Sequence, residues 1–490
     1  MQLFIGLDVG TSAVKGLLVS PDGRKIASGL RRVQHLHPSP ERTEIDPNGH
    51  YQCVTGLIRE LAGAVPTGDI VAALSMAFAS GNTILLDEAN NPLTNIISWL
   101  DRRTVGLAAM RTPGFDPAQV HAVVGWPASD GLPLAHLAWL KLKEPELYRQ
   151  AARVAMNVDW LGWRFTGRWG LDHSTATTFY LQDQVARRYH TPYLEFLGLR
   201  ESALSPLAPS GTPLGPLTSR AAADTGLPAG TLVVLGAFDH PCAARGTAAL
   251  NPGDLLISCG TSWVGFYPWP ERRFLVSQGM LVDPFLSPQG PWGGMSALTA
   301  VGTTVEWVIS NLVLGPRDDT ANRYQLFNEA AMRSTRGAGG LFLNPLQTVE
   351  ALGKRAAPAG TRREASARAI MEGTAFEMKR QIESLARAGL VARRVAMVGG
   401  PSESPVWPRI VAEVTGLTLS LVNGQTAAAM GAAVLAGIGA GIFADERDAA
   451  VRLAAQPQII TPAEDAVREY GDIYCRYREA VSAEAPRVMM

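Results

Sequence analysis

The chain has 490 residues, of which 47% are hydrophobic, and its 44 basic residues are balanced by 44 acidic ones. This length exceeds what one hydrophobic core usually organises, and it favours two domains of about 240 residues. The balanced charge excludes the strongly basic composition typical of proteins that bind nucleic acid or anionic membranes. We therefore expect neither of those partners, and a small molecule instead.

The cysteines and the N-terminal segment indicate a cytoplasmic protein. The four cysteines show neither the density of a disulfide scaffold nor the spacing of metal ligands. They are Cys53, Cys242, Cys259 and Cys475. The first residues form a strand-like segment rather than a basic region followed by an apolar signal segment. The uncharged stretch from Thr426 to Ala444 is dominated by alanine and glycine, which favours a buried, tightly packed helix pair over a membrane helix.

A β-hairpin is the first predicted element. Apolar runs from Leu3 to Leu7 and from Val14 to Val19 flank the segment Asp8–Ser12, and both runs have the residue types of strands. The Asp22–Gly23 dipeptide that follows is a common pair in hairpin turns. The sequence therefore places Asp8–Ser12 at a turn between two strands.

The turn Asp8–Ser12 is a candidate phosphate site. Its glycine lets backbone N–H groups approach phosphate oxygens closely, and the hydroxyls of Thr11 and Ser12 add donors in the same concavity. Asp8 adds a carboxylate, which needs a counterion beside a phosphate, so we expect a hydrated Mg²⁺ between Asp8 and a nucleotide. The alternative is a simple turn at a strand end, because short glycine motifs match by chance.

Strands and helices alternate through the rest of the first half. The apolar segments Ile70–Ser75 and Thr83–Asp87 predict further strands. Apolar residues recur at helical spacing from Leu134 to Leu142 and again in Asp159–Thr166. The stretch from Pro206 to Pro228 is rich in Pro, Gly and Ser, and we place the domain junction shortly after it. The predicted domains are residues 1–243 and 244–490.

A carboxylate and an imidazole stand together after the predicted strand Leu232–Leu235. The end of a parallel strand faces a crevice where ligands bind. Phosphoryl transfer to an alcohol needs a base within hydrogen-bond reach of the hydroxyl, and we assign that role to Asp239. The alternative is that Asp239 caps the following helix. His240 could be a metal ligand, a base or a donor; it has no partner at ligand spacing, so we favour binding of a substrate hydroxyl.

The second half opens with a near copy of the first motif. The segment Ser258–Ser262 follows the apolar run Leu255–Ile257 and precedes the β-rich segment Trp263–Tyr267, so we expect strand, glycine turn and strand again. Its Gly260–Thr261 pair repeats the glycine and threonine of the first turn. Two such turns half a chain apart predict a nucleotide clamp that is built twice.

A third glycine turn lies nearer the C-terminus. The strand-like segment Val395–Val398 leads into Gly399–Ser404, and a helical stretch runs from Trp407 to Val414. Strand, glycine turn and helix favour a phosphate or nucleoside at the N-terminus of the helix. The alternative is an ordinary strand-to-helix turn. The consistent order of three glycine turns favours the binding site.

The order of these motifs resembles the FGGY carbohydrate kinases of the actin-like ATPase superfamily, almost from end to end. The matching positions are Asp8–Ser12, Trp99, Asp101, Arg103, Asp159, Thr166–Gly167, Asp172, Ser174, Asp239, Cys259–Ser262, Gly302–Trp307, Glu372–Phe376, Gly399–Ser402 and Met430–Ala433. The resemblance implies an α/β fold of two ribonuclease-H-like domains, with mixed sheets flanked by helices and the active site in the interdomain cleft. It implies that the first domain binds sugar and carries the first phosphate loop, and that the second binds nucleotide.

The resemblance also implies ATP and Mg²⁺ as cofactors and gives roles to individual residues. Asp8 would organise Mg²⁺, and Asp239 would deprotonate the sugar hydroxyl. Thr11 and Thr261 would touch the transferring phosphates. The residues expected to contact the nucleotide are Thr11, Ser12, Gly260, Thr261, Gly302, Gly400, Pro401 and Ser404.

The sequence departs from its relatives where the sugar is expected. Xylulokinases and glycerol kinases carry Asp-Asn or Asp-Gln where this chain has Asp239–His240, and the substrate signatures of both are missing from Ala77–Gly81. The family's Gly-Glu-Arg-x-Pro segment is not recognisable in Leu346–Pro358. The residues that we expect to contact the acceptor are Ser80, Gly81, Asp239 and His240.

These observations predict an ATP-dependent carbohydrate kinase that transfers the γ-phosphoryl group to a hydroxyl of a linear ketose, polyol or sugar acid. A xylulokinase-like activity is the most specific form of this prediction. Two alternatives are a degenerate actin-like ATP-binding sugar sensor without phosphotransfer, and a chaperone-like ATP-binding protein whose output is domain motion. The partner would be a small sugar or polyol. Dimers are common in the family, so a homodimer is among the expected assemblies.

Overall fold

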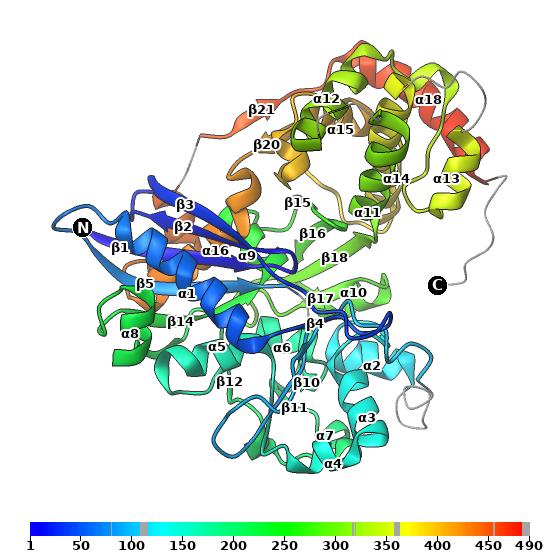
Figure 1. The fold of residues 1–490 in the computed structure, drawn as a ribbon. Helices are drawn as coiled ribbons and strands as arrows, with labels where there is room; N and C mark the ends of the chain where they lie inside the picture. Colours follow the sequence, from blue (N-terminus) through cyan, green and yellow to red (C-terminus); the bar gives the residue numbers. More distant parts are fainter. Residues whose placement is uncertain are drawn as a thin grey trace. The chain divides into compact units, whose positions relative to one another are not determined.

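The structure is a computed structural model that describes residues 1–79, 81–107, 116–315, 318, 320–356, 363–453 and 456–482. It forms two compact units (Figure 1). The first unit comprises Met1–Pro252, Pro268–Gly294 and Thr426–Ala455, and the second comprises Gly253–Tyr267, Met295–Gln425 and Gln456–Met490. Because these units interleave along the chain, the division into residues 1–243 and 244–490 stays a prediction.

A mixed six-stranded sheet with the order β13-β14-β5-β1-β2-β3 organises the first unit. Its strands are β1 (Gln2–Val9), β2 (Ala13–Val19), β3 (Lys25–Arg32), β5 (Ile70–Phe78), β13 (Pro213–Pro216) and β14 (Leu232–Phe238). β1 and β2 are antiparallel, which confirms the predicted hairpin, and Gly23 takes a φ of +84° in the turn before β3. β5 runs parallel to both β1 and β14.

Short strands and helices complete the first unit. The strands are β4 (Glu44–Ile45), β6 (Ile84–Leu86), β7 (Ile96–Ile97), β8 (Arg153–Ala155), β9 (Leu171–Asp172), β10 (Gln182–Asp183), β11 (Arg188–Tyr189), β12 (Leu207–Ala208) and β17 (Leu281–Asp283). The helices are α1 (Pro47–Gly63), α2 (Pro117–Val124), α3 (Pro133–Lys143), α4 (Pro145–Gln150), α5 (Asn157–Thr166), α6 (His173–Phe179), α7 (Thr191–Leu197), α8 (Ser219–Thr225), α9 (Asp239–Gly246), α10 (Arg272–Ser277), α16 (Ala427–Gly439) and α17 (Glu446–Arg452).

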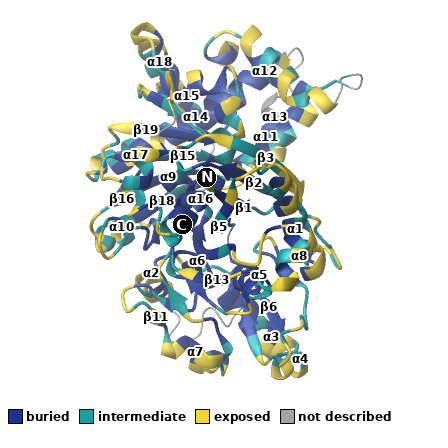
Figure 2. Cartoon of the chain, turned by 90° about the vertical axis from the view of Figure 1, so that its left-hand side faces the viewer, coloured by how far each residue is buried: buried dark blue, intermediate teal, exposed yellow. Residues whose placement is uncertain are grey.

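Helix α16 packs directly on the sheet of the first unit, although more than 400 residues separate it from β1 (Figures 1 and 2). Phe4 of β1 is fully buried in one cluster with Ala433 and Val434 of α16. A glycine in β1 permits this approach: a Cβ at Gly6 would lie 1.9 Å from the carbonyl oxygen of Ala429 in α16. Small residues therefore serve close packing here.

The prediction of a helix pair between Thr426 and Ala444 was wrong. One helix, α16, occupies most of that stretch, and Gly441 then takes a φ of +71° in the turn that follows it. The next helix, α17, begins only at Glu446. Across the described ranges, none of the helices combines the length and the apolar character that a membrane crossing requires.

The second unit repeats the strand plan of the first. Its strands follow the order β18-β16-β15-β19-β20-β21. They are β15 (Asp254–Cys259), β16 (Trp263–Trp269), β18 (Trp292–Leu298), β19 (Arg394–Gly399), β20 (Leu419–Leu421) and β21 (Gln458–Ile460). β15 is antiparallel to β16 and parallel to β19, as β1 is to β2 and β5. β20 is parallel to β19 and antiparallel to β21, as β14 is to β5 and β13.

Helices accompany this second sheet. They are α11 (Val301–Val308), α12 (Arg323–Arg333), α13 (Val349–Ala356), α14 (Arg363–Arg387), α15 (Trp407–Thr415) and α18 (Glu464–Ser482). Tyr470 of α18 donates to Glu372 of α14 at 2.8 Å, and Arg368 donates to the same carboxylate at 2.7 Å.

The predicted α/β class, with two mixed sheets flanked by helices, is confirmed.

Asp159 in α5 is a buried carboxylate, 1% exposed, that should make stability depend on pH. Burial raises the pKa of Asp159 to about 7, although hydrogen bonds from the Ser205 hydroxyl and the Met156 N–H oppose the rise. The folded state therefore holds this proton more tightly than the unfolded state. That stabilisation is present below the ordinary pKa of 3.8 and is lost as pH rises through about 7.

We expect Asp159→Asn to flatten the fall in the free energy of unfolding between pH 5 and pH 7.5, because the amide does not titrate. Denaturant unfolding at several pH values measures this slope. The control is Asp116→Asn, since Asp116 is exposed and its side chain makes no capping hydrogen bond. An unchanged slope in Asp159→Asn would show that Asp159 is ionised in the folded protein throughout this range.

Candidate active site

Three parallel strands of the first unit end at one edge of the sheet. Val9 of β1 pairs with Phe78 of β5, and Phe78 pairs with Phe238 of β14. Because parallel strands have their carboxyl ends at the same edge, the segments that follow these residues emerge together. The structure thus gathers the predicted segments Asp8–Ser12 and Asp239–His240 at this edge, next to Ala79, which follows β5.

Asp8 and Asp239 are the two acidic groups at this edge. Burial raises the pKa of Asp8 to about 7, with Lys15 opposing the rise and Asp239 adding to it. Lys15 Nζ lies 3.9 Å from Asp8 Oδ2, from the position opposite Asp8 in the hairpin. Burial also raises the pKa of Asp239, against the influence of His240 and Lys15. Two interacting carboxylates with raised pKa values suit acid–base chemistry.

Asp239 is the first residue of α9 rather than its N-cap, which is Phe238. Its Oδ1 accepts the His240 N–H at 2.7 Å, so the carboxylate lies in the first turn, where the helix dipole favours negative charge. The side chain is 26% exposed and that of His240 is 20% exposed. Both groups are therefore oriented by the helix and still reachable by a small molecule.

The carboxylates also bear on the expected Mg²⁺. Within the described ranges, no group of three or more His, Cys, Asp or Glu residues could hold a metal ion. Mg²⁺ differs from zinc in keeping several waters and binding through one or two carboxylates plus the oxygens of a phosphate. Asp8 and Asp239 fit that requirement, and a closed protein cage is not needed.

Trp99 is a site residue whose role the sequence did not reveal. Its indole Nε1 donates to the Thr11 hydroxyl at 2.9 Å. Two residues further on, Asp101 bonds to the guanidinium of Arg103, and both side chains are at most 5% exposed. The Trp-x-Asp-x-Arg pattern was visible in the sequence. Only the hydrogen bond to Thr11, which lies 88 residues earlier in the chain, shows that Trp99 supports the first phosphate turn.

A pair of buried residues holds the strand end that leads into Asp239. The N–H of Phe238 donates to Ser174 Oγ at 3.1 Å, and Ser174 Oγ donates to Asp283 Oδ2 at 2.7 Å. Asp283 Oδ1 in turn accepts the Phe285 N–H at 2.8 Å. Ser174 is 2% exposed and Asp283 is 1% exposed. Ser174 belonged to a sequence motif, whereas no sequence signal marked Asp283.

We expect Ser174→Ala to lower kcat roughly tenfold, because it removes the acceptor of the Phe238 N–H and one of the two hydrogen bonds to the buried Asp283 carboxylate, beside the base. The KM for ATP should stay unchanged, and the pH dependence of kcat should shift. Ser210→Ala is the matched control, since Ser210 lies in the same unit and makes only a long contact of 3.5 Å to Asp172. An equal effect of both substitutions on melting temperature and kcat would indicate a purely structural role.

Of the expected acceptor residues Ser80 and Gly81, the structure describes only Gly81. Ser80 lies outside the described residues. Gly81 is buried, and a Cβ there would lie 2.1 Å from the Thr178 carbonyl oxygen and 2.8 Å from Pro133 Cδ. The absence of a side chain at Gly81 therefore has a packing reason. Its contact with an acceptor stays a prediction.

The second unit gathers most of the predicted nucleotide residues at the equivalent edge of its own sheet. Cys259 of β15 pairs with Gly399 of β19, so the turns that follow both strands lie together. Gly399 has a φ of +95°, and a Cβ there would lie 2.0 Å from the Cys259 carbonyl oxygen. Gly302 donates its N–H to the Thr261 carbonyl at 2.8 Å, and its Cβ would lie 2.7 Å from the Gly260 oxygen.

The third glycine turn has open space at its start, whereas the side chain at its end already makes hydrogen bonds. Gly400 and Pro401 begin a short 3-10 turn, Gly400–Glu403, and a Cβ at Gly400 would meet no atom within 4 Å. That open space is available to a ligand. Ser404, in contrast, already uses its hydroxyl: it donates to Asn328 Oδ1 at 2.7 Å and accepts the Trp407 N–H at 3.1 Å. A contact of Ser404 with the nucleotide stays a prediction.

Comparisons with known proteins identify the family of this chain. The N-terminal domain of the FGGY family of carbohydrate kinases matches residues 3–246, and the C-terminal domain of that family matches residues 255–440. An autoinducer-2 kinase from Klebsiella pneumoniae subsp. pneumoniae is 27% identical, over 94% of this chain and 90% of its own. One from Yersinia pestis bv. Antiqua is 27% identical, over 90% of this chain and 86% of its own.

Solved structures agree on the fold. A ligand-bound xylulose kinase from Lactobacillus acidophilus has a TM-score of 0.85 at 21% identity, with 99% of each chain covered. A glycerol kinase from Plasmodium falciparum with ADP has a TM-score of 0.83 at 17% identity, with 100% of this chain and 99% of that chain covered. With both domain matches spanning most of its length, this chain belongs to the FGGY family of carbohydrate kinases.

Proposed function

We propose that this kinase transfers the γ-phosphoryl group of ATP to a hydroxyl of a linear ketose, polyol or sugar acid, with Asp239 as the base. The observation that supports this most is the partly exposed Asp239 carboxylate at the edge where β1, β5 and β14 end. A base must lie within hydrogen-bond reach of the proton that it removes. The raised pKa of Asp239 makes its carboxylate a better proton acceptor than an ordinary aspartate.

The remaining roles follow from the groups present. The hydroxyl of Thr11, fixed by Trp99, and the Gly260–Thr261 turn supply donors for phosphate oxygens. Mg²⁺, when bound through water by Asp8, would supply positive charge to the phosphates. Gly302 sits against the second turn and holds its backbone in place through the hydrogen bond to Thr261. Phosphoryl transfer depends mainly on such positioning and charge, and only the acceptor needs a base.

The names of the relatives support a small, hydroxyl-rich acceptor. The two relatives compared above are autoinducer-2 kinases, and the solved structures include xylulose, gluconate and glycerol kinases. Within that range, His240 is the residue that we assign to a substrate oxygen, because it follows the base directly and is partly exposed. We infer that His240 contributes to the choice of acceptor.

A coupled assay of ADP release with a panel of acceptors tests this function. The panel contains xylulose, gluconate, glycerol and autoinducer-2, and an acceptor-free reaction gives the baseline. We expect at least one member to raise turnover by two orders of magnitude or more, because ordering the acceptor beside ATP is a large part of the rate enhancement. ATP binding without stimulation by any sugar, polyol or sugar acid would favour the sensor.

A further inference from the structure

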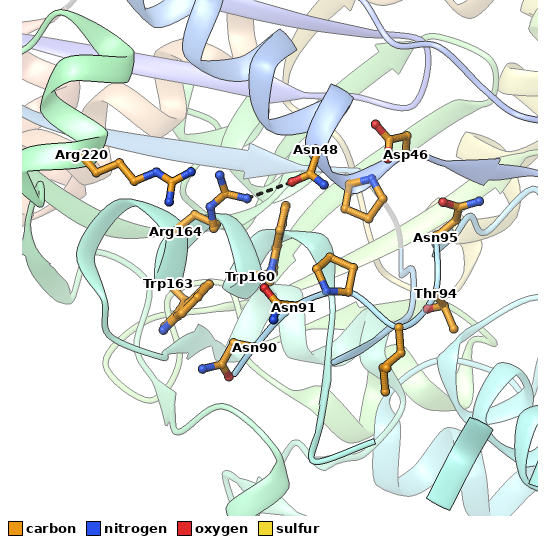
Figure 3. A pocket seen from close by; sticks show the side chains of 13 residues that line it. Asp46, Asn48, Asn90, Asn91, Thr94, Asn95, Trp160, Trp163, Arg164 and Arg220 are labelled. Carbon is orange, nitrogen blue, oxygen red and sulfur yellow. Dashed lines mark hydrogen bonds between the residues drawn. The ribbon is translucent and has the colours of Figure 1, made fainter. Parts of the chain in front are cut away.

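A polar pocket lies in the first unit, apart from the candidate active site. Its walls come from segments other than those that carry Asp8 and Asp239. Its volume is about 650 Å³, and its walls come from the start of α1, the segment 90–95, helix α5 and Arg220 of α8 (Figure 3). The side chains that matter most for its chemistry are Asn48, Asn91, Trp160, Trp163, Arg164 and Arg220. Nothing in the proposed phosphotransfer uses this pocket.

Two guanidinium groups give the pocket a positive charge. Arg164 Cζ lies 3.8 Å from the centre of the Tyr51 ring and 5.0 Å from that of Trp160, so aromatic faces hold it. Burial lowers the pKa of Arg164, and the charge of Arg220 contributes to the lowering. The charge of Asp224 acts on Arg164 in the opposite sense and offsets part of this lowering. Both guanidinium groups line the pocket.

The acids nearby are occupied. Asp224, which attracts Arg164, accepts the Tyr51 hydroxyl at 2.8 Å. Asp46 lines the pocket, but its Oδ2 accepts the Gly49 N–H at 2.6 Å and caps α1. Asp224 thus attracts Arg164 and also accepts the Tyr51 hydroxyl, and the two arginines still repel each other. A bound anion would relieve the repulsion between them.

The other walls offer neutral hydrogen-bonding groups and flat apolar faces. Asn48 accepts Arg164 Nη1 at 3.3 Å, and its amide nitrogen can still donate. Trp160 is fully buried, so its ring supports the pocket wall from behind. Trp163 stacks on Trp169, with ring centres 5.6 Å apart, which fixes its ring at the pocket.

We propose that this pocket binds a small phosphorylated sugar or polyol. The phosphate would lie between Arg164 and Arg220, which suit a doubly charged oxyanion because guanidinium groups bind it through paired N–H donors. Asparagine amides would serve the hydroxyl groups, and the Trp163 indole would cover the carbon skeleton. Such a ligand is of the same chemical class as the product of a carbohydrate kinase, so the site would let phosphorylated metabolites act on the enzyme away from its catalytic residues.

Isothermal titration of the full-length enzyme tests this proposal with three probes: inorganic phosphate, xylulose 5-phosphate and unphosphorylated xylulose. Phosphate esters also bind a kinase active site. Binding in the pocket is therefore identified by comparing the wild type with the arginine variants. Arg220→Gln and Arg164→Gln should each weaken one xylulose 5-phosphate binding event at least tenfold, because each removes charged hydrogen bonds to the phosphate. Acceptor-free and acceptor-stimulated ATP turnover should stay at the wild-type level in Arg220→Gln.

The matched control is Arg200→Gln, since Arg200 is exposed in the same unit and does not line this pocket. Arg164 packs against aromatic rings, so Arg220→Gln is the variant that keeps the test decisive if Arg164→Gln fails to fold. Identical isotherms for the wild type and Arg220→Gln would overturn the proposal. Equal affinity for inorganic phosphate and xylulose 5-phosphate, with no effect of Asn91→Ala, would overturn the assignment of a sugar.

Discussion

Asp239→Asn should lower kcat for the acceptor reaction by roughly 10²–10⁴-fold while the fold and ATP binding survive. The amide has the same shape and keeps an oxygen that can accept the His240 N–H, which the carboxylate accepts at 2.7 Å. It cannot accept a proton from the acceptor hydroxyl. The ADP-release assay measures kcat, titration with ATP measures nucleotide binding, and thermal melting checks the fold.

Asp116→Asn is the control for Asp239→Asn, because Asp116 is an exposed aspartate directly before another helix of the same unit. It should leave kcat unchanged. Near-normal turnover in Asp239→Asn would remove Asp239 from the mechanism, and an equal loss in both variants would show that charge in general, rather than one base, had been changed.

Gly431→Ala should destabilise the first unit by roughly 3 kcal/mol or more and reduce turnover with it. Helices α9 and α16 touch through their backbones: a Cβ at Gly431 would lie 1.8 Å from the Cys242 carbonyl oxygen, and a Cβ at Gly246 would lie 2.1 Å from the Ala427 oxygen. A methyl group at Gly431 cannot be accommodated by turning a side chain. Helix α9 must move instead, and α9 begins with Asp239.

The control for Gly431→Ala is Gly63→Ala at the end of α1, where a Cβ would meet no atom within 4 Å. Alanine is the better helix former, so this substitution should be neutral or stabilise by up to about 1 kcal/mol. Denaturant unfolding gives both values. A Gly431→Ala variant as stable as Gly63→Ala would contradict the close contact between α9 and α16.

Local patterns predicted the parts of this fold that depend on neighbouring residues. Both hairpins form where apolar runs flank a Gly-Thr-Ser turn, since the turn and its strands lie within some twenty residues. The position of Asp239 was also predictable, because a polar residue after a buried strand marks the carboxyl edge of a sheet. The duplicated order of the two sheets confirms the symmetry that the paired turns suggested.

The hydrogen bonds between residues far apart in the chain could not be predicted from the sequence. Asp283 bonds to Ser174 across 109 residues, and Trp99 bonds to Thr11 across 88. No local pattern encodes which distant side chain completes such a pair. The helix-pair prediction failed for a related reason. An uncharged alanine-rich stretch contains no residue pattern that marks where a helix ends. Gly441 is recognised as part of the turn only from its φ of +71°.

Phosphorus NMR of the complete reaction tests the central claim most directly, since it follows the phosphoryl group itself. The enzyme is mixed with ATP, Mg²⁺ and the acceptor that stimulates ADP release most. We expect a new phosphate-ester signal that grows in step with ADP, is absent without the acceptor, and is lost in Asp239→Asn. Growth of inorganic phosphate in step with ADP, without a phosphate ester, would contradict sugar phosphorylation and leave an ATPase.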